Sequence, residues 1–233
     1  MIDVKQAEHF KLKDNRYSNN LLFNPPKHTQ EEISIIIDTL KKRDIKKVAE
    51  LGSGNGRLTI PLLKNEIYVT AIDICKESLG ELTNTIRQMD IKMDLLSTST
   101  TIPIDTYEAF VGCDILHHVD IDTYLKKMKK RVTKHKGLLL FSEPNIVNIS
   151  WLIFITLFLD WTVEKGIFQC NYFTLLQKLK KNHYTNIQIL GFGLLPPPLL
   201  NMFPLLQKMN YWFGSLPIVK FFAYRFIIKA EMN

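Results

Sequence analysis

Three alternating glycines and two acids form the stretch of the chain whose residue types and spacing most clearly indicate a binding site. Glu50 precedes Gly52, Gly54 and Gly56, and Asp73 follows Gly52 by 21 positions (73 − 52). Alternating glycines let the backbone turn sharply and leave room for a ligand against the main chain, so we expect a side chain at Gly52 or Gly54 to fill that room. An acid about 20 residues further on suits the two hydroxyls of a ribose. The spacing therefore predicts a site for a ligand that contains a ribose.

The spacing of the glycines argues against a dinucleotide as that ligand. A dinucleotide-binding loop has the pattern G-x-G-x-x-G, whereas these glycines are two apart throughout and follow an acid. A pyrophosphate gains nothing from Glu50, while a ligand with a cationic end and no phosphates does. The helix expected after Gly56 directs its unpaired N–H groups at the same site. A nucleotide-binding Rossmann domain of another kind is the alternative.

Apolar runs around these residues predict strands and helices that alternate along the chain. We expect strands at residues 45–51, 67–72, 92–97, 109–113, 137–142, 187–192 and 224–230, and helices at 29–43, 58–63, 77–89, 124–132 and 172–181. Thr29-Gln30-Glu31-Glu32 is a capping box that should open the first helix, and Pro61 should kink the second. The alternation predicts an α/β fold with a parallel, doubly wound sheet, in which ligands bind at the carboxyl ends of the strands.

The stretch from Glu50 to Gly56 resembles motif I of the class I S-adenosylmethionine-dependent methyltransferases (type 11 or 12), and Asp73 resembles their ribose-binding acid. The segment 114–120 is similar to their motif IV. The resemblance implies a Rossmann-like, seven-stranded sheet with an antiparallel last strand, in a domain over residues 29–233. It also implies apolar helical inserts at about 146–170 and 193–221. Residues 1–28 would form an N-terminal arm that covers the cofactor as a lid, with a solvated arm as the alternative.

The resemblance places the cofactor S-adenosyl-L-methionine on the glycine turn and the neighbouring strand ends. Glu50 is expected to reach the methionine part of the cofactor. The family often has an acid near Ser97 or Thr98 that bonds the adenine amine, and here a hydroxyl can accept that bond. Asp114 either contacts the cofactor or caps the following helix. The expected cofactor-binding residues are Glu50, Gly52, Ser53, Gly54, Gly56, Asp73, Ile74, Thr98, Cys113 and Asp114.

Three side chains expected at the same edge can remove a proton from an acceptor. His117 and His118 titrate near neutrality, and Glu143 can act as a base where its pocket raises its pKa. Each has a structural alternative. The histidine pair can cap or pack the helix that it opens, and Glu143 can bond backbone N–H groups of its loop. A neutral amine as acceptor needs no base.

Composition limits the remaining classes of protein. The 233 residues carry a net charge of +7, 46% hydrophobic residues and three cysteines without metal-ligand spacing. We therefore expect no metal and no disulfide framework, and a reducing compartment. The first residues lack the apolar stretch of a signal peptide, and no run is long enough to span a membrane. Basic runs at 41–47, 126–136 and 178–181 are expected to be solvated faces, with phosphate binding as the alternative.

The sequence thus predicts an enzyme that transfers a methyl group from S-adenosylmethionine to a small-molecule acceptor by in-line displacement. Glu143-Pro144-Asn145 and the apolar inserts resemble those of bacterial methyltransferases often found with saccharide or lipid biosynthesis. An apolar or lipid-linked acceptor is therefore the favoured interpretation. An RNA methyltransferase and a non-catalytic module that binds the cofactor are the alternatives.

The apolar segments at 151–161 and 194–221 are open to two interpretations. They form either a cap packed on the domain or a surface that touches a bilayer. The expected location is cytoplasmic, with peripheral contact at the inner membrane face as an option. Nucleic acid is not the expected partner, and the sequence leaves the oligomeric state open.

Overall fold

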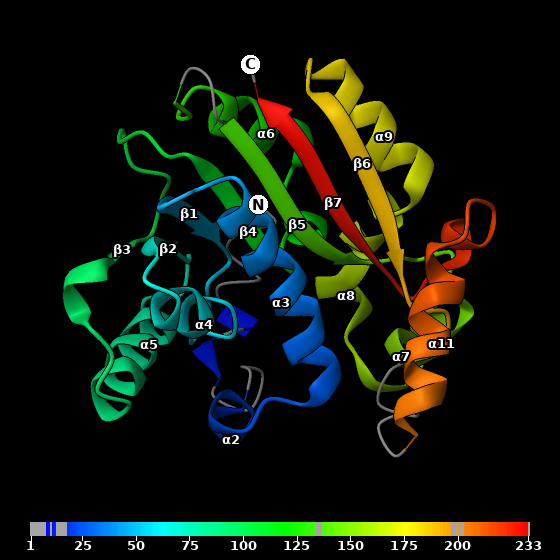
Figure 1. Cartoon of the computed structure of the whole chain (residues 1–233), viewed down its shortest axis with the longest axis horizontal. Coiled ribbons are helices and arrows are strands. Elements are labelled where there is room, and N and C mark those ends of the chain that lie inside the picture. The colour runs from blue at the N-terminus through cyan, green and yellow to red at the C-terminus, as the bar shows by residue number, and fades with distance from the viewer. Residues whose placement is uncertain are drawn as a thin grey trace.

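A single seven-stranded sheet organises the part of the chain that the computed structural model describes, which is residues 8–9, 11–12, 18–133, 137–196, 200 and 203–232 (Figure 1). The spatial order is β3-β2-β1-β4-β5-β7-β6. All neighbours pair in parallel except β7, which is antiparallel to both β5 and β6. The α/β sheet with an antiparallel last strand is confirmed. The strands are β1 (Lys47–Leu51), β2 (Tyr68–Ile72), β3 (Leu96–Ser99), β4 (Ala109–Cys113), β5 (Gly137–Pro144), β6 (Thr185–Phe192) and β7 (Arg225–Met232).

Helices cover both faces of the sheet because successive residues of each buried strand point to opposite sides. Val48 of β1 belongs to the core under α3, α4 and α5, and its neighbour Ala49 to the core under α6 and α9. The helices are α2 (Asn19–Phe23), α3 (Lys27–Lys42), α4 (Thr59–Lys64), α5 (Lys76–Gln88), α6 (Ile121–Lys129), α7 (Ile149–Phe158), α8 (Trp161–Glu164), α9 (Tyr172–Lys181) and α11 (Pro204–Ser215). Short 3₁₀ turns include Met93–Leu95, Leu116–His118, Lys165–Gln169 and Val219–Phe222.

Three local expectations differ from the structure. The capping box at 29–32 does not open α3, which begins at Lys27 after Pro26, so Thr29 is buried inside the helix. Proline can precede a helix at no cost, because an N–H at that place has no helical partner. Pro61 lies in the first turn of α4, where its missing N–H breaks no helical bond. The strand expected at 92–97 begins only at Leu96, after the turn Met93–Leu95.

The N-terminal arm is described only in part. Within it, α2 sends Leu22 into the core that α3 shares, and the expected boundary at residue 28 falls inside α3. None of the described arm residues lines the large cavity of the molecule, and the rest of the expected lid lies outside the described residues.

The apolar inserts lie at one end of the sheet. In Figure 1, α7, α8 and α11 gather at the lower right, beyond the carboxyl end of β5. The side chain of Asn148 donates to the carbonyls of Leu194 and Phe222, both at 2.8 Å, so the first insert is bonded to both ends of the second. The inserts therefore border the edge at which a ligand of this fold binds.

Candidate active site

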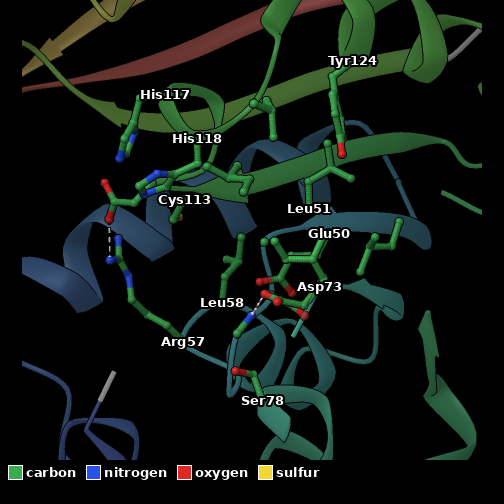
Figure 2. A pocket seen from close by; sticks show the side chains of 18 of the residues that line it. Glu50, Leu51, Arg57, Leu58, Asp73, Ser78, Cys113, His117, His118 and Tyr124 are labelled. Atoms are coloured by element: carbon green, nitrogen blue, oxygen red, sulfur yellow. Dashed lines mark hydrogen bonds and ion pairs between the residues drawn. The ribbon is translucent and has the colours of Figure 1, made fainter. Parts of the chain in front are cut away.

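One large cavity, of about 1050 Å³, opens at the carboxyl ends of β1, β2 and β4 (Figure 2). Its volume lies just above the usual range for small-molecule sites, about 300–1,000 Å³. The lining comes from strand ends, from α6 and from the first insert. It includes Glu50–Asn55, Arg57, Leu58, Ile72–Ile74, Ser78, Thr100–Ile102, Cys113–Ile115, His117–Val119, Tyr124, Lys127, Lys130, Arg131, Pro144, Trp151, Phe154, Leu159, Glu164 and Ile167.

The glycine turn after β1 has three left-handed residues, with φ of +65° at Gly52, +51° at Gly54 and +112° at Gly56. A side chain on Gly54 would meet open space, so this glycine faces the cavity. A Cβ on Gly52 would instead lie 2.7 Å from the Ile115 side chain, and one on Gly56 would lie 2.6 Å from Leu82. A side chain at Gly52 would therefore meet Ile115 and not the expected ligand, although Gly52 itself lines the cavity.

Asp73 joins the end of β2 to this turn. Its Oδ2 accepts a hydrogen bond from the Gly54 N–H at 2.8 Å, and its Oδ1 accepts one from Cys75 N–H at 2.8 Å. Burial raises the pKa of Asp73, although both hydrogen bonds favour the ionised form. Asp73 and Glu50 lie side by side at the same end of the sheet (Figure 2).

Glu50 is buried at the end of β1, and the Thr59 hydroxyl donates to its Oε2 at 2.6 Å. Burial raises the pKa of Glu50 to about 8, and the nearby charge of Asp73 adds to the effect. The side chain is therefore protonated near neutral pH until a cation approaches it.

Asp114 stands at the end of β4 with a left-handed φ of +57°. Arg57 Nη1 and Arg225 Nη2 each donate to its carboxylate at 2.6 Å. Burial opposes ionisation, but the two guanidinium groups hold the pKa of Asp114 well below its usual range. Glu32 of α3 lies 3.2 Å from both arginines. Asp114 does not cap α6, because Asp120 does so by accepting from Thr123 N–H at 2.7 Å. The ion-pair network fixes the loop after β4.

Glu143 of β5 is fully buried and does not line the cavity. Its Oε1 accepts from the N–H groups of Ile115 and Leu116, both at 2.8 Å. Its Oε2 lies 2.7 Å from His117 Nδ1. The carboxylate has no path to an acceptor in the cavity, so the expectation of a base at Glu143 is wrong. Its role is to position the loop after β4.

His117 lies between two carboxylates. Nδ1 faces Glu143, and Nε2 lies 3.4 Å from Glu164 Oε2, at the end of α8. Burial disfavours a charged ring, but the bonds to Cys170, Glu143 and Glu164 outweigh it and raise the pKa of His117 well above its ordinary value. The two carboxylates therefore favour the protonated form of His117, which makes it the poorer proton acceptor of the pair. It ties the loop after β4 to β5 and to the first insert.

His118 has the opposite environment, although its ring centroid lies only 4.0 Å from that of His117. Burial lowers the pKa of His118 to about 4, and the charge on His117 adds to the effect. The ring lines the cavity (Figure 2) and is neutral at physiological pH. It is the histidine of the pair that retains the capacity to accept a proton.

The other expected residues divide into two groups. Ser53, Ile74 and Cys113 line the cavity as expected, but Thr98 and Gly56 do not. Thr98 is exposed on the edge strand β3, and Thr100 and Thr101 line the cavity instead, because β3 starts later than predicted. Sequence reasoning did not find Arg57, Arg225, Glu164, Cys170, Ser78 or Tyr124. An acid inside an apolar insert was the only signal for Glu164.

Two groups of described side chains bring ligand-type atoms within 4.8 Å of one another: His117, His118 and Glu164, and His117, Glu143 and Cys170. Both include His117, whose ring nitrogens lie 2.7 Å from Glu143 Oε2 and 3.4 Å from Glu164 Oε2.

Comparison with known proteins agrees with this geometry. Residues 49–141 match the model of the methyltransferase domain family, and the match covers the glycine turn, Asp73 and the segment through β5. Residues 49–141 are therefore a methyltransferase domain of the class I, S-adenosylmethionine-dependent type. S-adenosylmethionine is the cofactor of this family, and the open face of Gly54, the paired acids and the cavity volume fit it.

Solved structures share the fold of this methyltransferase at low sequence identity. The methyltransferase domain of bacterial CtHen1-CN is 17% identical, with a TM-score of 0.60, over 88% of this chain and 100% of that one. Magnesium protoporphyrin IX methyltransferase from Synechocystis PCC 6803, solved with bound S-adenosylhomocysteine, is 14% identical, with a TM-score of 0.57, over 88% and 83%. An uncharacterized RNA methyltransferase of Bdellovibrio bacteriovorus is 32% identical over 90 residues, which cover 38% of this chain and only 23% of that relative.

Proposed function

We propose that this methyltransferase moves the methyl group of S-adenosylmethionine to an oxygen of a small, largely apolar acceptor. The main support for the proposal is that one cavity has a polar part and an apolar part. One part presents Glu50, Gly54 and Asp73, and the part formed by the first insert presents Trp151, Phe154 and Ile167. A polar cofactor suits the first part, and an apolar acceptor suits the second.

The first part would hold the cofactor through three kinds of contact. Asp73 would accept hydrogen bonds from the ribose hydroxyls, since a carboxylate offers several lone pairs. The Gly54 backbone would lie against the ligand without a Cβ between them. Glu50 would become ionised beside the cationic methionine part, because an opposite charge lowers the pKa of a buried acid. Thr100 and Thr101 would lie near the base in place of Thr98.

The second part would orient the acceptor and remove its proton. Bound S-adenosylmethionine supplies a methyl group that is already activated by a sulfonium. The apolar walls exclude water and hold the acceptor in line, which can be worth an effective molarity of roughly 10⁵ M or more. His118 would accept the hydroxyl proton, because its neutral ring faces the cavity. Base catalysis of this kind contributes typically 10²–10⁴-fold.

A two-stage experiment tests the proposal. Calorimetry with S-adenosylhomocysteine should show binding to the wild type, and Asp73→Ala should weaken it by roughly 1–3 kcal/mol, the value of a buried charge-assisted hydrogen bond. Transfer of a labelled methyl group is then measured across a panel of hydroxyl-bearing isoprenoid, acyl and aromatic acceptors. Unchanged affinity in Asp73→Ala would refute the ribose assignment. Binding without transfer to any acceptor would favour a non-catalytic module.

An RNA substrate is the second candidate, because cations border the cavity. Lys127, Lys130 and Arg131 line it beside Tyr124, and the Bdellovibrio relative is named an RNA methyltransferase. RNA held by these cations would bind less tightly as salt rises, with a slope set by the number of phosphates contacted. Affinity for a structured RNA that is weak and independent of salt would remove this candidate.

A further inference from the structure

Hydrogen bonds hold the two apolar inserts together at one end of the sheet. The side chain of Asn210 on α11 accepts from the N–H groups of Leu194 and Leu195, both at 2.8 Å. The indole of Trp151 on α7 donates to the Tyr224 carbonyl at 2.7 Å. The side chain of Asn148, next to α7, donates to the carbonyls of Leu194 and Phe222, so both helices are bonded to the segment at Leu194. α7 and α11 are therefore anchored to the domain together (Figure 1).

Large apolar side chains on both helices face solvent. Leu157 is 67% exposed and Phe158 70% on α7, and Leu205 is 71% exposed and Trp212 60% on α11. We call the exposed large apolar residues of α7 and α11 the apolar platform. They are Ile149, Leu152, Ile153, Phe154, Leu157 and Phe158 on α7, and Leu205, Leu206, Met209, Trp212 and Phe213 on α11. Only Ile155 of α7 is buried, so apolar side chains surround this helix on most sides. A partner protein would cover a single stripe, whereas acyl chains can surround such a helix.

The two apolar inserts carry few charges, and the basic residues of the second insert are lysines. No charged residue occurs from Asn145 to Leu159, and from Gly193 to Tyr224 the only charged residues are Lys208 and Lys220. The two acids of the first insert are engaged in the fold: Asp160 accepts from Thr162 N–H at the start of α8, and Glu164 faces His117 in the cavity. Exposed apolar and aromatic residues with lysines beside them are typical of a segment that lies in the headgroup region of an anionic bilayer.

The apolar platform is continuous with the cavity. Phe154 and Leu159 line the cavity and are also exposed on the surface. The Phe158 ring of the apolar platform lies 5.5 Å from the Phe154 ring. A molecule with an apolar tail can therefore lie along α7 with its head in the cavity.

From this continuity we propose that the apolar platform docks on an anionic bilayer and that the acceptor is an amphiphile carried in that bilayer. This inference rests on the proposed function for the identity of the reaction. No helix among the described residues is long and apolar enough to cross a membrane. The contact is therefore one with the bilayer surface, and the acceptor head reaches His118 from the side of α7.

Vesicle binding by the full chain tests the docking without any turnover. Vesicles of phosphatidylcholine alone are compared with vesicles that also contain phosphatidylglycerol, at low and high salt. The wild type should bind the anionic vesicles more tightly, and salt should weaken the binding. Leu157→Glu and Trp212→Glu should each reduce partitioning by roughly tenfold, because each places a charge where a large apolar group was buried in lipid. Ile104→Glu is the matched control, since Ile104 is 81% exposed but lies outside the inserts.

Three outcomes would overturn the docking. The first is that the wild type binds neither kind of vesicle. The second is that the platform variants bind vesicles as tightly as the wild type does. The third is that the wild type binds no vesicles but forms a dimer, and that Leu157→Glu dissociates this dimer. Unchanged calorimetric affinity for S-adenosylhomocysteine shows that the variants are folded. Asp73→Ala should still bind vesicles, so a failed reaction and a failed docking give different results. If the protein methylates detergent-solubilised acceptors but does not bind vesicles, the proposed function stands and the docking of the apolar platform on a bilayer is rejected.

Discussion

The two parts of the cavity are built in different ways. The cofactor part consists of a backbone turn and two acids within 24 residues (50–73), and short-range hydrogen bonds such as that from Gly54 to Asp73 hold it. The acceptor part consists of side chains from the loop after β4, from β5 and from the first insert, and His117 joins them. The first part depends on local backbone geometry, whereas the second depends on a buried charged network. Substitutions in the cofactor part should therefore change cofactor affinity, whereas substitutions in the acceptor part should change turnover or stability.

The largest expected effect separates the two histidines of the acceptor part. His118→Ala should lower kcat by roughly 10²–10⁴-fold, because it removes the proposed proton acceptor. The wild-type rate should fall only as the pH approaches about 4, where His118 gains its proton. Steady-state kinetics across pH provide the measurement, with the exposed His183→Asn as control. Equal and small losses in His118→Ala and His183→Asn would make His118 a packing residue.

His117→Ala should instead act on stability. It leaves Glu143 and Glu164 without the cation between them, and breaking a buried ion pair costs about 3–5 kcal/mol. Because the pKa of His117 is raised, its contribution is complete below the ordinary histidine pKa and is lost as the pH rises through the raised value. The difference from the wild type in the free energy of unfolding should therefore be largest at mildly acidic pH. Urea denaturation at several pH values would show it, and a difference that grows with pH would contradict the assignment.

Gly54→Ala tests the cofactor part. The residue has φ of +51° and faces open space, so alanine is strained there and its methyl group enters the cavity. We expect a loss of roughly tenfold in affinity for S-adenosylhomocysteine, which corresponds to about 1.4 kcal/mol. Gly80→Ala is the matched control, because Gly80 lies in α5 with open space at its Cβ position. That change should stabilise the helix by about 0.5–1 kcal/mol and leave affinity unchanged. The same affinity in both variants would place the ligand elsewhere.

The smallest effect concerns one proton on Glu50. With a pKa of about 8, Glu50 is mostly protonated at pH 7, and a cationic ligand beside it should release up to about one proton. Calorimetry in buffers of different ionisation enthalpy measures this release, which Glu50→Gln should abolish. The native state binds a proton that the unfolded state loses near pH 4.5, so stability falls between pH 4.5 and 8. Glu50→Gln should therefore gain stability relative to the wild type as the pH rises across that interval, and a constant difference would contradict the raised pKa.

The contrast between the two parts also explains what could be predicted from the sequence. Glu50, Gly54 and Asp73 could be proposed as cofactor-binding residues from the sequence because they lie close together along the chain. The role of Glu143 could not, because its hydrogen-bond partners Ile115 and Leu116 lie 28 and 27 residues away. Arg225 lies 111 residues from Asp114, and no local pattern connects them. The proximity of Ile115 to Gly52 could not be predicted either, since only the fold brings Ile115 against it.

The position of β7 has a consequence for how the protein is made. β7 lies between β5 and β6 in the sheet, and its first residue, Arg225, pairs with Asp114 beside the cavity. During synthesis on the ribosome, Asp114 emerges 111 residues before that partner. The nascent chain can assemble β1 to β5 early, but the loop after β4 acquires its second arginine only when β7 inserts. Cofactor capture should therefore be a late event in the maturation of each molecule, and a stalled chain that ends before Arg225 should have an incomplete site.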